Sequence, residues 1–195
     1  MKQDFLEIVI LAGGKSSRMG QDKALMLFHQ KPMIEWILEA SLKTNYPVRI
    51  IANNPAYSQF GVPVISDIIP EKGPMGGLFT ALTTTKSKYV FLLSCDTPLI
   101  KNEILQYMIS KLTTQEVLVA SLQGKILPLL AIYHSDLKKV VLENISSNKL
   151  KMQELIRSLV YQELEIPNFL APQPEVFANI NTIDEFAELQ KGVVL

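Results

Sequence analysis

Short apolar runs that end at glycine, asparagine or aspartate, and that alternate with helical patterns, are the feature that most constrains this fold. The apolar runs lie at residues 8–11, 48–52, 62–65 and 89–93. Apolar side chains at helical spacing follow at residues 32–43, 76–85 and 100–112. Continuous apolar runs of this length are typical of strands that are buried on both faces. Alternating β and α elements therefore predict a mostly parallel sheet that is covered by helices on both faces.

The pattern changes in the second half of the chain. Two apolar runs, 117–121 and 126–133, flank Gln123 and Gly124, which predicts a β-hairpin added to the sheet. The remaining patterns predict helices at 137–145 and 151–159, a last strand at 176–180 and a last helix at 183–190. We expect a three-layer α/β/α fold of the Rossmann-like kind. The length of 195 residues favours one domain that spans residues 1–195.

Composition excludes several classes of function. The chain carries 19 Lys and Arg and 19 Asp and Glu, so a general nucleic-acid binder, which needs clustered cations, is not expected. Cys95 is the single cysteine, which excludes an internal disulfide and a cysteine metal cage and favours a small buried apolar role. No segment approaches the roughly 20 apolar residues that span a bilayer. Asp4 and Glu7 stand where a signal peptide would be basic, and we expect a cytoplasmic protein without a membrane anchor.

A glycine-rich and basic loop follows the first predicted strand, over residues 11–25. It is not a Walker A loop, because Val9 occupies the position of the first glycine, and Lys15 breaks the dinucleotide-binding pattern. Glycines nevertheless allow backbone N–H groups to approach an anion closely. Lys15, Arg18 and Lys23 add cations that can bind phosphate. The loop therefore indicates a phosphate site, and the alternative is an ordinary surface loop with solvated cations.

Polar residues also follow the other predicted strands. Ligands of open α/β sheets bind at the carboxyl ends of the strands, where this sequence places Gly13, Asn53, Asp67 and Asp96. Their convergence predicts a site with two carboxylates beside the glycine loop. The alternatives are that Asp96 only begins a helix and that Asp67 only caps a loop.

The loop resembles the signature L-A-G-G-x-S-x-R-M-G-x-D-K of nucleotidyltransferases similar to molybdenum cofactor guanylyltransferase, and all ten specified positions are present. Four further blocks resemble segments of this family and occur in the same order. They are Asp67 with Gly-Pro-Met-Gly-Gly at 73–77, Cys-Asp-Thr-Pro at 95–98, Pro-Leu-Leu-Ala-Ile-Tyr at 128–133 and Asn-Ile-Asn-Thr at 179–182. Met75 replaces the usual leucine, and Ile183 stands where proline usually follows.

The resemblance implies a nucleotidyltransferase fold and a Mg²⁺-dependent transfer of GMP from GTP to the terminal phosphate of molybdopterin, with release of pyrophosphate. It implies catalytic roles for Lys23, Arg18 and Asp96, with Lys23 on the triphosphate and Asp96 as the Mg²⁺ ligand. It implies nucleotide contacts for Leu11, Ala12, Gly13, Asn53 and Asp67. It implies pterin contacts for Pro128, Asn179 and Asn181.

Two other functions stay open at this stage. One is a related nucleotidyltransferase that uses CTP with molybdopterin or acts on a sugar phosphate; the paired glycines Gly13 and Gly14 favour the guanylyl branch. The other is a catalytically silent nucleotide-binding protein, against which the retention of Lys23, Asp67 and Asp96 argues. We expect a monomer. Because the pterin is labile, transient partners that deliver it and accept the product are also expected, although no residue identifies one.

Overall fold

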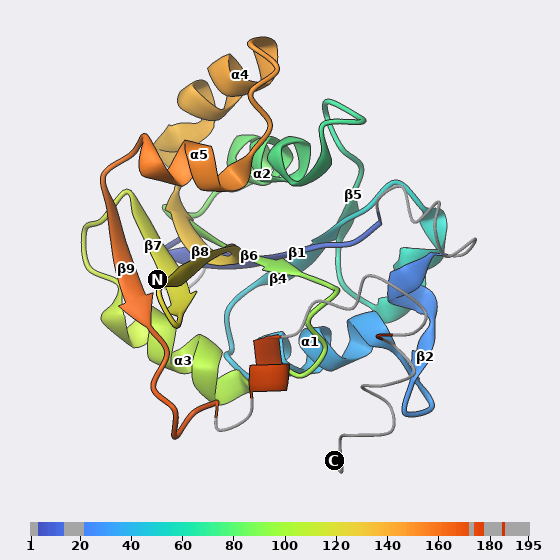
Figure 1. The fold of residues 1–195 in the computed structure, drawn as a ribbon. Helices are drawn as coiled ribbons and strands as arrows, with labels where there is room; N and C mark the ends of the chain where they lie inside the picture. Colours follow the sequence, from blue (N-terminus) through green and yellow to red (C-terminus); the bar gives the residue numbers. More distant parts are fainter. Residues whose placement is uncertain (1–3, 14–21, 172–173, 178–184, 186–195) are drawn as a thin grey trace.

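The computed structural model describes residues 4–13, 22–171, 174–177 and 185 of the chain. In this part of the chain the main sheet has seven strands, in the order β5-β4-β1-β6-β8-β7-β9 (Figure 1). The strands are β1 (Leu6–Leu11), β4 (Val48–Ile51), β5 (Val64–Ile65), β6 (Tyr89–Ser94), β7 (Val117–Leu122), β8 (Lys125–His134) and β9 (Tyr161–Glu165). A separate two-stranded sheet consists of β2 (Leu27–Phe28) and β3 (Lys31–Pro32).

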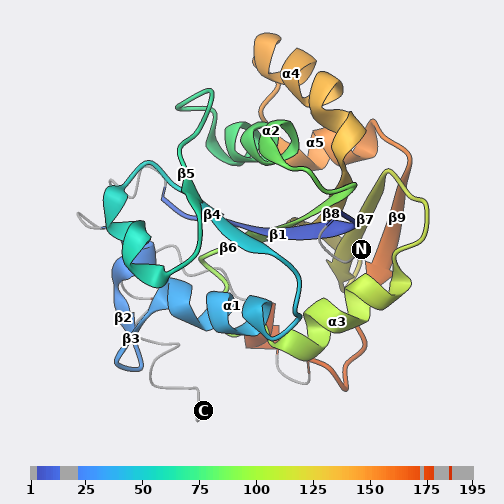
Figure 2. The same cartoon turned by 180° about the vertical axis from the view of Figure 1, so that it is seen from behind.

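Helices cover both faces of the main sheet. They are α1 (Met33–Leu42), α2 (Gly73–Thr84), α3 (Asn102–Lys111), α4 (Lys138–Ser146) and α5 (Met152–Arg157). Helices α1 and α3 lie on one face, and α2, α4 and α5 lie on the other, as the two opposite views show (Figures 1 and 2). The three-layer α/β/α class is therefore confirmed.

The alternation of side chains along each strand produces two separate cores. In β1, Ile8 and Ile10 face the core beneath α1 and α3, whereas Val9 belongs to the core beneath α2, α4 and α5. Successive residues of a strand point to opposite faces of the sheet, so a strand between two helical layers must be apolar at nearly every position. This explains why all six residues of β6 are buried.

Only β8 runs against the other strands of this sheet. Strands β5, β4, β1 and β6 are parallel, β8 pairs antiparallel with both β6 and β7, and β7 pairs parallel with β9. The predicted hairpin is thus confirmed as β7–β8, and it is built into the sheet. Gln123 and Gly124 form its turn with positive φ values of 51° and 74°. Because β8 is reversed, its beginning lies at the edge of the sheet where the parallel strands end.

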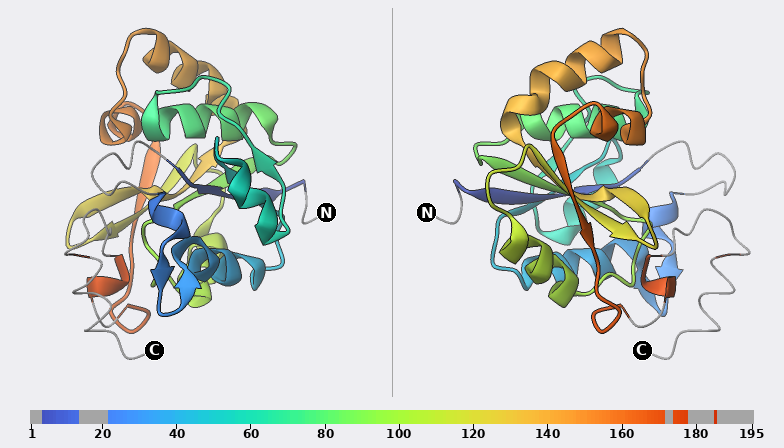
Figure 3. Two further views of the ribbon diagram at one scale, coloured as in Figure 1. Left: turned by 90° about the vertical axis from the view of Figure 1, so that its right-hand side faces the viewer. Right: turned by 60° about the vertical axis from the view of Figure 1, so that its left-hand side comes forward.

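The carboxyl-terminal part of the predicted secondary structure needs a correction. A strand was expected at 176–180, but residues Pro174–Phe177 form the 3₁₀ helix η4. The last strand that the structure describes is β9, which the sequence pattern did not indicate and which lies at the sheet edge (Figure 3, right). It is mostly exposed and polar, so it lacks the apolar pattern of a central strand. Residues 178–184 and 186–190 of the last expected strand and helix lie outside the described part of the chain.

Candidate nucleotide-binding site

The end of β1 is the centre of the candidate site. The Cys95 N–H donates a hydrogen bond of 3.1 Å to the Leu11 carbonyl, and the Ala12 N–H donates one of 2.9 Å to the Ile51 carbonyl. The chain then turns at Gly13, whose φ of 84° favours glycine. A Cβ at Gly13 would meet no heavy atom within 4 Å, so among the described residues this backbone is open to a ligand.

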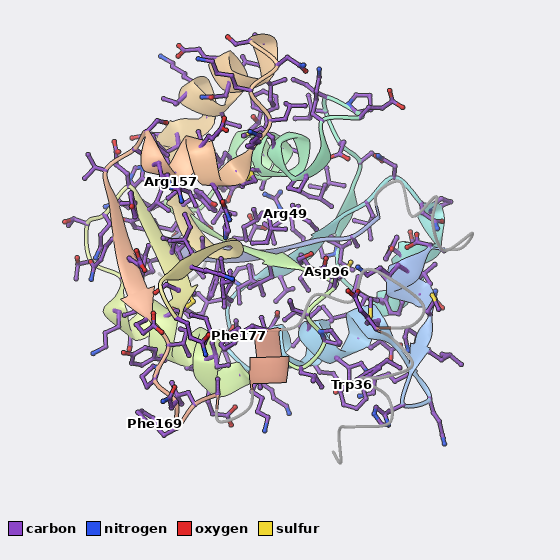
Figure 4. All side chains as sticks on the ribbon, viewed as in Figure 1. Trp36, Arg49, Asp96, Arg157, Phe169 and Phe177 are labelled. Carbon is purple, nitrogen blue, oxygen red and sulfur yellow. The ribbon has the colours of Figure 1, made fainter. Side chains whose placement is uncertain are left out.

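Lys23 and Asp96, two of the predicted site residues, come together at this edge. Lys23 opens the 3₁₀ helix η1 (Lys23–Leu25), and Asp96 follows β6 at its carboxyl end (Figure 4). The Lys23 Nζ lies 3.5 Å from Asp96 Oδ2, and the two side chains are only 14% and 19% exposed. Asp96 Oδ1 is buried and has no hydrogen-bond partner within the described residues. A buried carboxylate oxygen without a partner is costly, and a bound cation would relieve that cost.

Asn53 and Asp67 form a second pair of predicted residues. Asn53 Nδ2 donates to Asp67 Oδ2 at 3.2 Å, and the Asp67 N–H donates to Asn53 Oδ1 at 2.9 Å. Burial raises the pKa of Asp67, and the Asn53 hydrogen bond opposes this shift. In the described structure Asp67 Oδ1 is a buried acceptor without a partner. The pair therefore presents a fixed acceptor that suits a ligand hydroxyl or N–H group.

The loop that carries Asp67 is fixed on α2. The Ile68 N–H donates to Thr80 Oγ1 at 2.9 Å. A Cβ at Gly76 would lie 2.8 Å from the Ile69 carbonyl oxygen, and a Cβ at Gly77 would lie 2.7 Å from Leu11 Cδ2. The two glycines thus allow α2 to approach both the Asp67 loop and the end of β1. This close packing gives a physical reason for the Gly-Gly pair of the motif at 73–77.

A pocket of about 280 Å³ adjoins Asp96 on the side of the reversed strand. Residues 126–130 of β8 line it, together with Ser94 and Thr97 on either side of Asp96 in the chain and Phe177 of η4. Pro128, expected to face an acceptor, lines this pocket, and its carbonyl accepts a hydrogen bond of 2.8 Å from the Tyr133 hydroxyl. The pocket is therefore lined by the residues that flank Asp96 in the chain and by the beginning of β8.

The donor set limits how this site could hold a metal ion. Within the described residues no group of three or more His, Cys, Asp and Glu side chains is arranged to hold a metal. Asp96 fits Mg²⁺ as a single carboxylate ligand, because Mg²⁺ usually takes one or two carboxylates and completes its shell with phosphate oxygens and water. Among the described residues, the site thus suits a metal that arrives with a polyphosphate.

Some predicted residues lie outside the described part of the chain, namely Arg18, Asn179 and Asn181. Other residues at the site were not singled out from the sequence. Asp22 belongs to the motif but had no assigned role, and it binds the side chains of Asn54 and Tyr57. The pattern of the 53–60 segment gave no signal for these contacts.

The described structure is thus a three-layer α/β protein whose candidate site lies at the carboxyl edge of the sheet, where open α/β proteins bind their ligands. Residues 8–164 match the family described as the MobA-like NTP transferase domain. The chain belongs to this family.

Relatives agree with this assignment. The chain is 37% identical over 187 residues to a Flavobacterium johnsoniae protein named "Probable molybdenum cofactor guanylyltransferase", with 94% of this chain and 96% of the relative covered. A Clostridium perfringens protein of the same name is 35% identical, with 93% and 94% covered.

Solved structures share the fold. An Aquifex aeolicus protein, 32% identical, superposes with a TM-score of 0.78 over 92% of this chain and 95% of its own. Molybdopterin-guanine dinucleotide biosynthesis protein A from Archaeoglobus fulgidus, at 20% identity, has a TM-score of 0.81 over 95% and 97%. In the described part of this chain, no helix is both long and apolar enough to cross a membrane.

Proposed function

We propose that this protein transfers GMP from GTP to the terminal phosphate of molybdopterin and releases pyrophosphate, as the names of its relatives suggest. The observation that carries the proposal is the Lys23–Asp96 pair, 3.5 Å apart, at the sheet edge that also holds the open Gly13 backbone and the pocket beside Pro128. A nucleoside triphosphate and a phosphate acceptor need to meet at such a point. The family match over residues 8–164 supports the same reaction class.

The nucleotide would lie against the ends of β1, β4 and β5. The open backbone at Gly13 suits the base and sugar, with Leu11 and Ala12 as further expected contacts, and the Asn53–Asp67 pair offers a fixed acceptor for the nucleoside. Lys23, which is paired with Asp96, would contact the triphosphate. This arrangement separates the recognition of the nucleoside from the binding of its charge.

The transfer itself needs little acid–base chemistry. A terminal phosphate oxygen of the pterin attacks the α-phosphorus of GTP, the bond from that phosphorus to the bridging oxygen breaks, and pyrophosphate leaves with the electron pair. Because the nucleophile is already an anion, the chain has to hold two anions together and stabilise charge on the leaving group. Lys23 would supply one positive charge at the triphosphate, and we propose a second from Arg18.

We also propose that Asp96 holds Mg²⁺. When bound, this ion would neutralise charge on the triphosphate and its leaving group. The support for this role is the buried and unpartnered Asp96 Oδ1, next to an oxygen that already faces a cation. Pro128 would line the acceptor site, with Asn179 and Asn181 as further pterin contacts.

The test is a calorimetric titration of GTP, CTP, UTP and ATP with Mg²⁺, followed by pyrophosphate release in the presence of molybdopterin. We expect preferential binding of GTP and guanylyl transfer by the native protein. Preference for CTP or UTP would contradict the guanylyl assignment, and binding without any release of pyrophosphate would indicate a silent nucleotide-binding protein.

Asp96→Ala should reduce transfer by about 10²–10³, because each lost contact to developing charge typically has an effect of this size. Asp136→Ala is the matched control, since the Asp136 side chain is 89% exposed and lies outside the site. Equal transfer by the Asp96 and Asp136 variants would exclude the proposed role of Asp96.

A further inference from the structure

Asp22 immediately precedes Lys23, yet both of its carboxylate oxygens are bound by other side chains. The Tyr57 hydroxyl donates to Oδ1 at 2.6 Å, and Asn54 Nδ2 donates to Oδ2 at 3.0 Å. Hydrogen bonds to an ionised acceptor are shorter and stronger than those between neutral groups. The carboxylate is therefore held in one orientation by two donors from the segment that follows β4.

The segment that supplies these donors is itself firmly placed. Asn54 Oδ1 accepts the Ala56 N–H at 3.0 Å and so begins the 3₁₀ helix η2 (Pro55–Phe60). Tyr57 is fully buried in the core beneath α1 and α3. Burial, together with the hydrogen bond to Asp22, raises the pKa of Tyr57 far above its usual range. The Tyr57 hydroxyl therefore stays protonated and remains a donor throughout the physiological pH range.

The backbone on the other side of Asp22 leads directly to the candidate cation. The Leu25 N–H donates to the Asp22 carbonyl at 3.0 Å, which fixes the first turn of η1. Lys23 leaves this turn toward Asp96, and Ala24 beside it is buried. The anchored Asp22 and the Lys23 that approaches Asp96 therefore belong to one turn, so the position of one affects the position of the other.

We propose that Asn54 and Tyr57 are positioning residues for the triphosphate: by anchoring the Asp22 carboxylate they fix the turn that places Lys23 beside Asp96. The inference rests on the proposed function, because it assumes that Lys23 contacts a nucleoside triphosphate. Asn53, the neighbour of Asn54, binds Asp67 on the nucleoside side. Consecutive asparagines would thus serve the two ends of the same ligand.

The first test compares the affinities of GTP and GMP, both with Mg²⁺, for the native protein and for Tyr57→Phe. We expect Tyr57→Phe to weaken GTP binding about tenfold, because it removes one of the two hydrogen bonds that anchor the Asp22 carboxylate. GMP lacks the β- and γ-phosphates, so its affinity should be unchanged. A variant that only loosened the fold would weaken both nucleotides alike, and that result would overturn the proposal.

Tyr89→Phe is the matched control. Tyr89 is also a buried tyrosine whose hydroxyl donates to an internal acceptor, the Thr113 carbonyl, at 3.3 Å. It opens β6, at the opposite end of the strand from Asp96, and should leave both affinities unchanged. Equal losses of GTP affinity in the two phenylalanine variants would count against a specific role for Tyr57.

Two further variants separate this role from folding and from the proposed function. Asn54→Asp keeps an oxygen that can accept the hydrogen bond from the Ala56 N–H but places a second carboxylate against Asp22. It should therefore weaken GTP binding at least as much as Tyr57→Phe does. In a Lys23→Ala background, Tyr57→Phe should cause no further loss of GTP affinity, and a full tenfold additional loss would overturn the proposal. If the native protein prefers CTP, the guanylyl assignment fails, and the comparison of CTP with CMP tests the same positioning role.

Discussion

Asp67 combines a role at the candidate site with a position that disfavours its charge. Its backbone and one carboxylate oxygen are bound by Asn53, while Oδ1 is buried without a partner in the described structure. Burial raises the pKa of this carboxyl, so the folded state binds its proton more tightly than the unfolded chain does. The stability that comes from this proton is present at low pH and is lost as pH rises through the raised pKa.

Asp67→Asn should therefore stabilise the fold at neutral pH while it weakens GTP binding. We expect Tm to rise by about 1–2 °C at pH 7, because the amide avoids the desolvation of a charge. The difference should vanish below the ordinary pKa of 3.8, where the native carboxyl is also neutral. Thermal denaturation from pH 3 to 8 measures this, with Asp136→Asn as an exposed control. A stability gain that is independent of pH would contradict the assigned cause.

The sequence was informative for residues that follow strands and uninformative for contacts between distant loops. Gly13, Asn53, Asp67 and Asp96 could be predicted to converge because parallel strands end at one edge of the sheet. The contact between Tyr57 and Asp22 spans 35 positions of the chain and joins two irregular segments. No periodicity connects such segments, so only the folded structure could identify this pair.

At the scale of elements, α2 determines where the Asp67 loop lies. Gly76 lets the helix approach the Ile69 carbonyl, and Thr80 binds the Ile68 N–H. Helix propensity alone disfavours glycine in a helix by about 1 kcal/mol, so the close approach must offset this cost. The backbone of the loop and the backbone of the helix thus define one rigid unit.

Gly76→Ala should be destabilising although alanine is the better helix former. Its Cβ would lie 2.8 Å from a backbone oxygen that cannot move without shifting the Asp67 loop. We expect a loss of about 1–3 kcal/mol in the free energy of unfolding, the usual cost of overpacking, and weaker GTP binding. Urea denaturation and calorimetry measure the two effects. Thr83→Ala, at an exposed position of the same helix, should be neutral or slightly stabilising, and equal behaviour of the two variants would contradict this role of Gly76.

Elements with a clear apolar pattern were predictable, and those without one were not. All four apolar runs, which became β1, β4, β5 and β6, were expected from their composition. Strand β9 was missed because its sequence, Tyr-Gln-Glu-Leu-Glu, is polar and exposed and its pairing with β7 comes from the tertiary structure. The short strands β2 and β3 were missed for a related reason, since two residues are too few to show a period.

At the scale of the whole molecule, one sheet separates two cores that depend on the same strands. Residues of β1 and β6 contribute alternately to the core beneath α1 and α3 and to the core beneath α2, α4 and α5. Neither helical layer can leave without exposing one face of these strands. The single domain expected for residues 1–195 stays a prediction, and the coupling of the described strands suggests how to test it.

Calorimetry should accordingly show one cooperative unfolding transition for the full chain. Saturating GTP with Mg²⁺ should raise the midpoint by several degrees, because a ligand at 100 times its Kd adds about 2.7 kcal/mol to the stability of the folded state. Two transitions, of which GTP shifts only one, would contradict the single-domain prediction. GMP at about 100 times its own Kd should raise the midpoint by the same amount, because the stabilisation depends only on the ratio of ligand concentration to Kd.

The reversed direction of β8 has a consequence for how such a protein can change over time. The proposed nucleotide site lies at the ends of the parallel strands, whereas the pocket beside Pro128 is lined by the beginning of β8. Replacements in residues 126–130 would reshape the acceptor pocket without altering the loops at 11–13, 53 and 67. If the proposed function holds, the preference for the acceptor can diverge under selection while the preference for the nucleotide is retained.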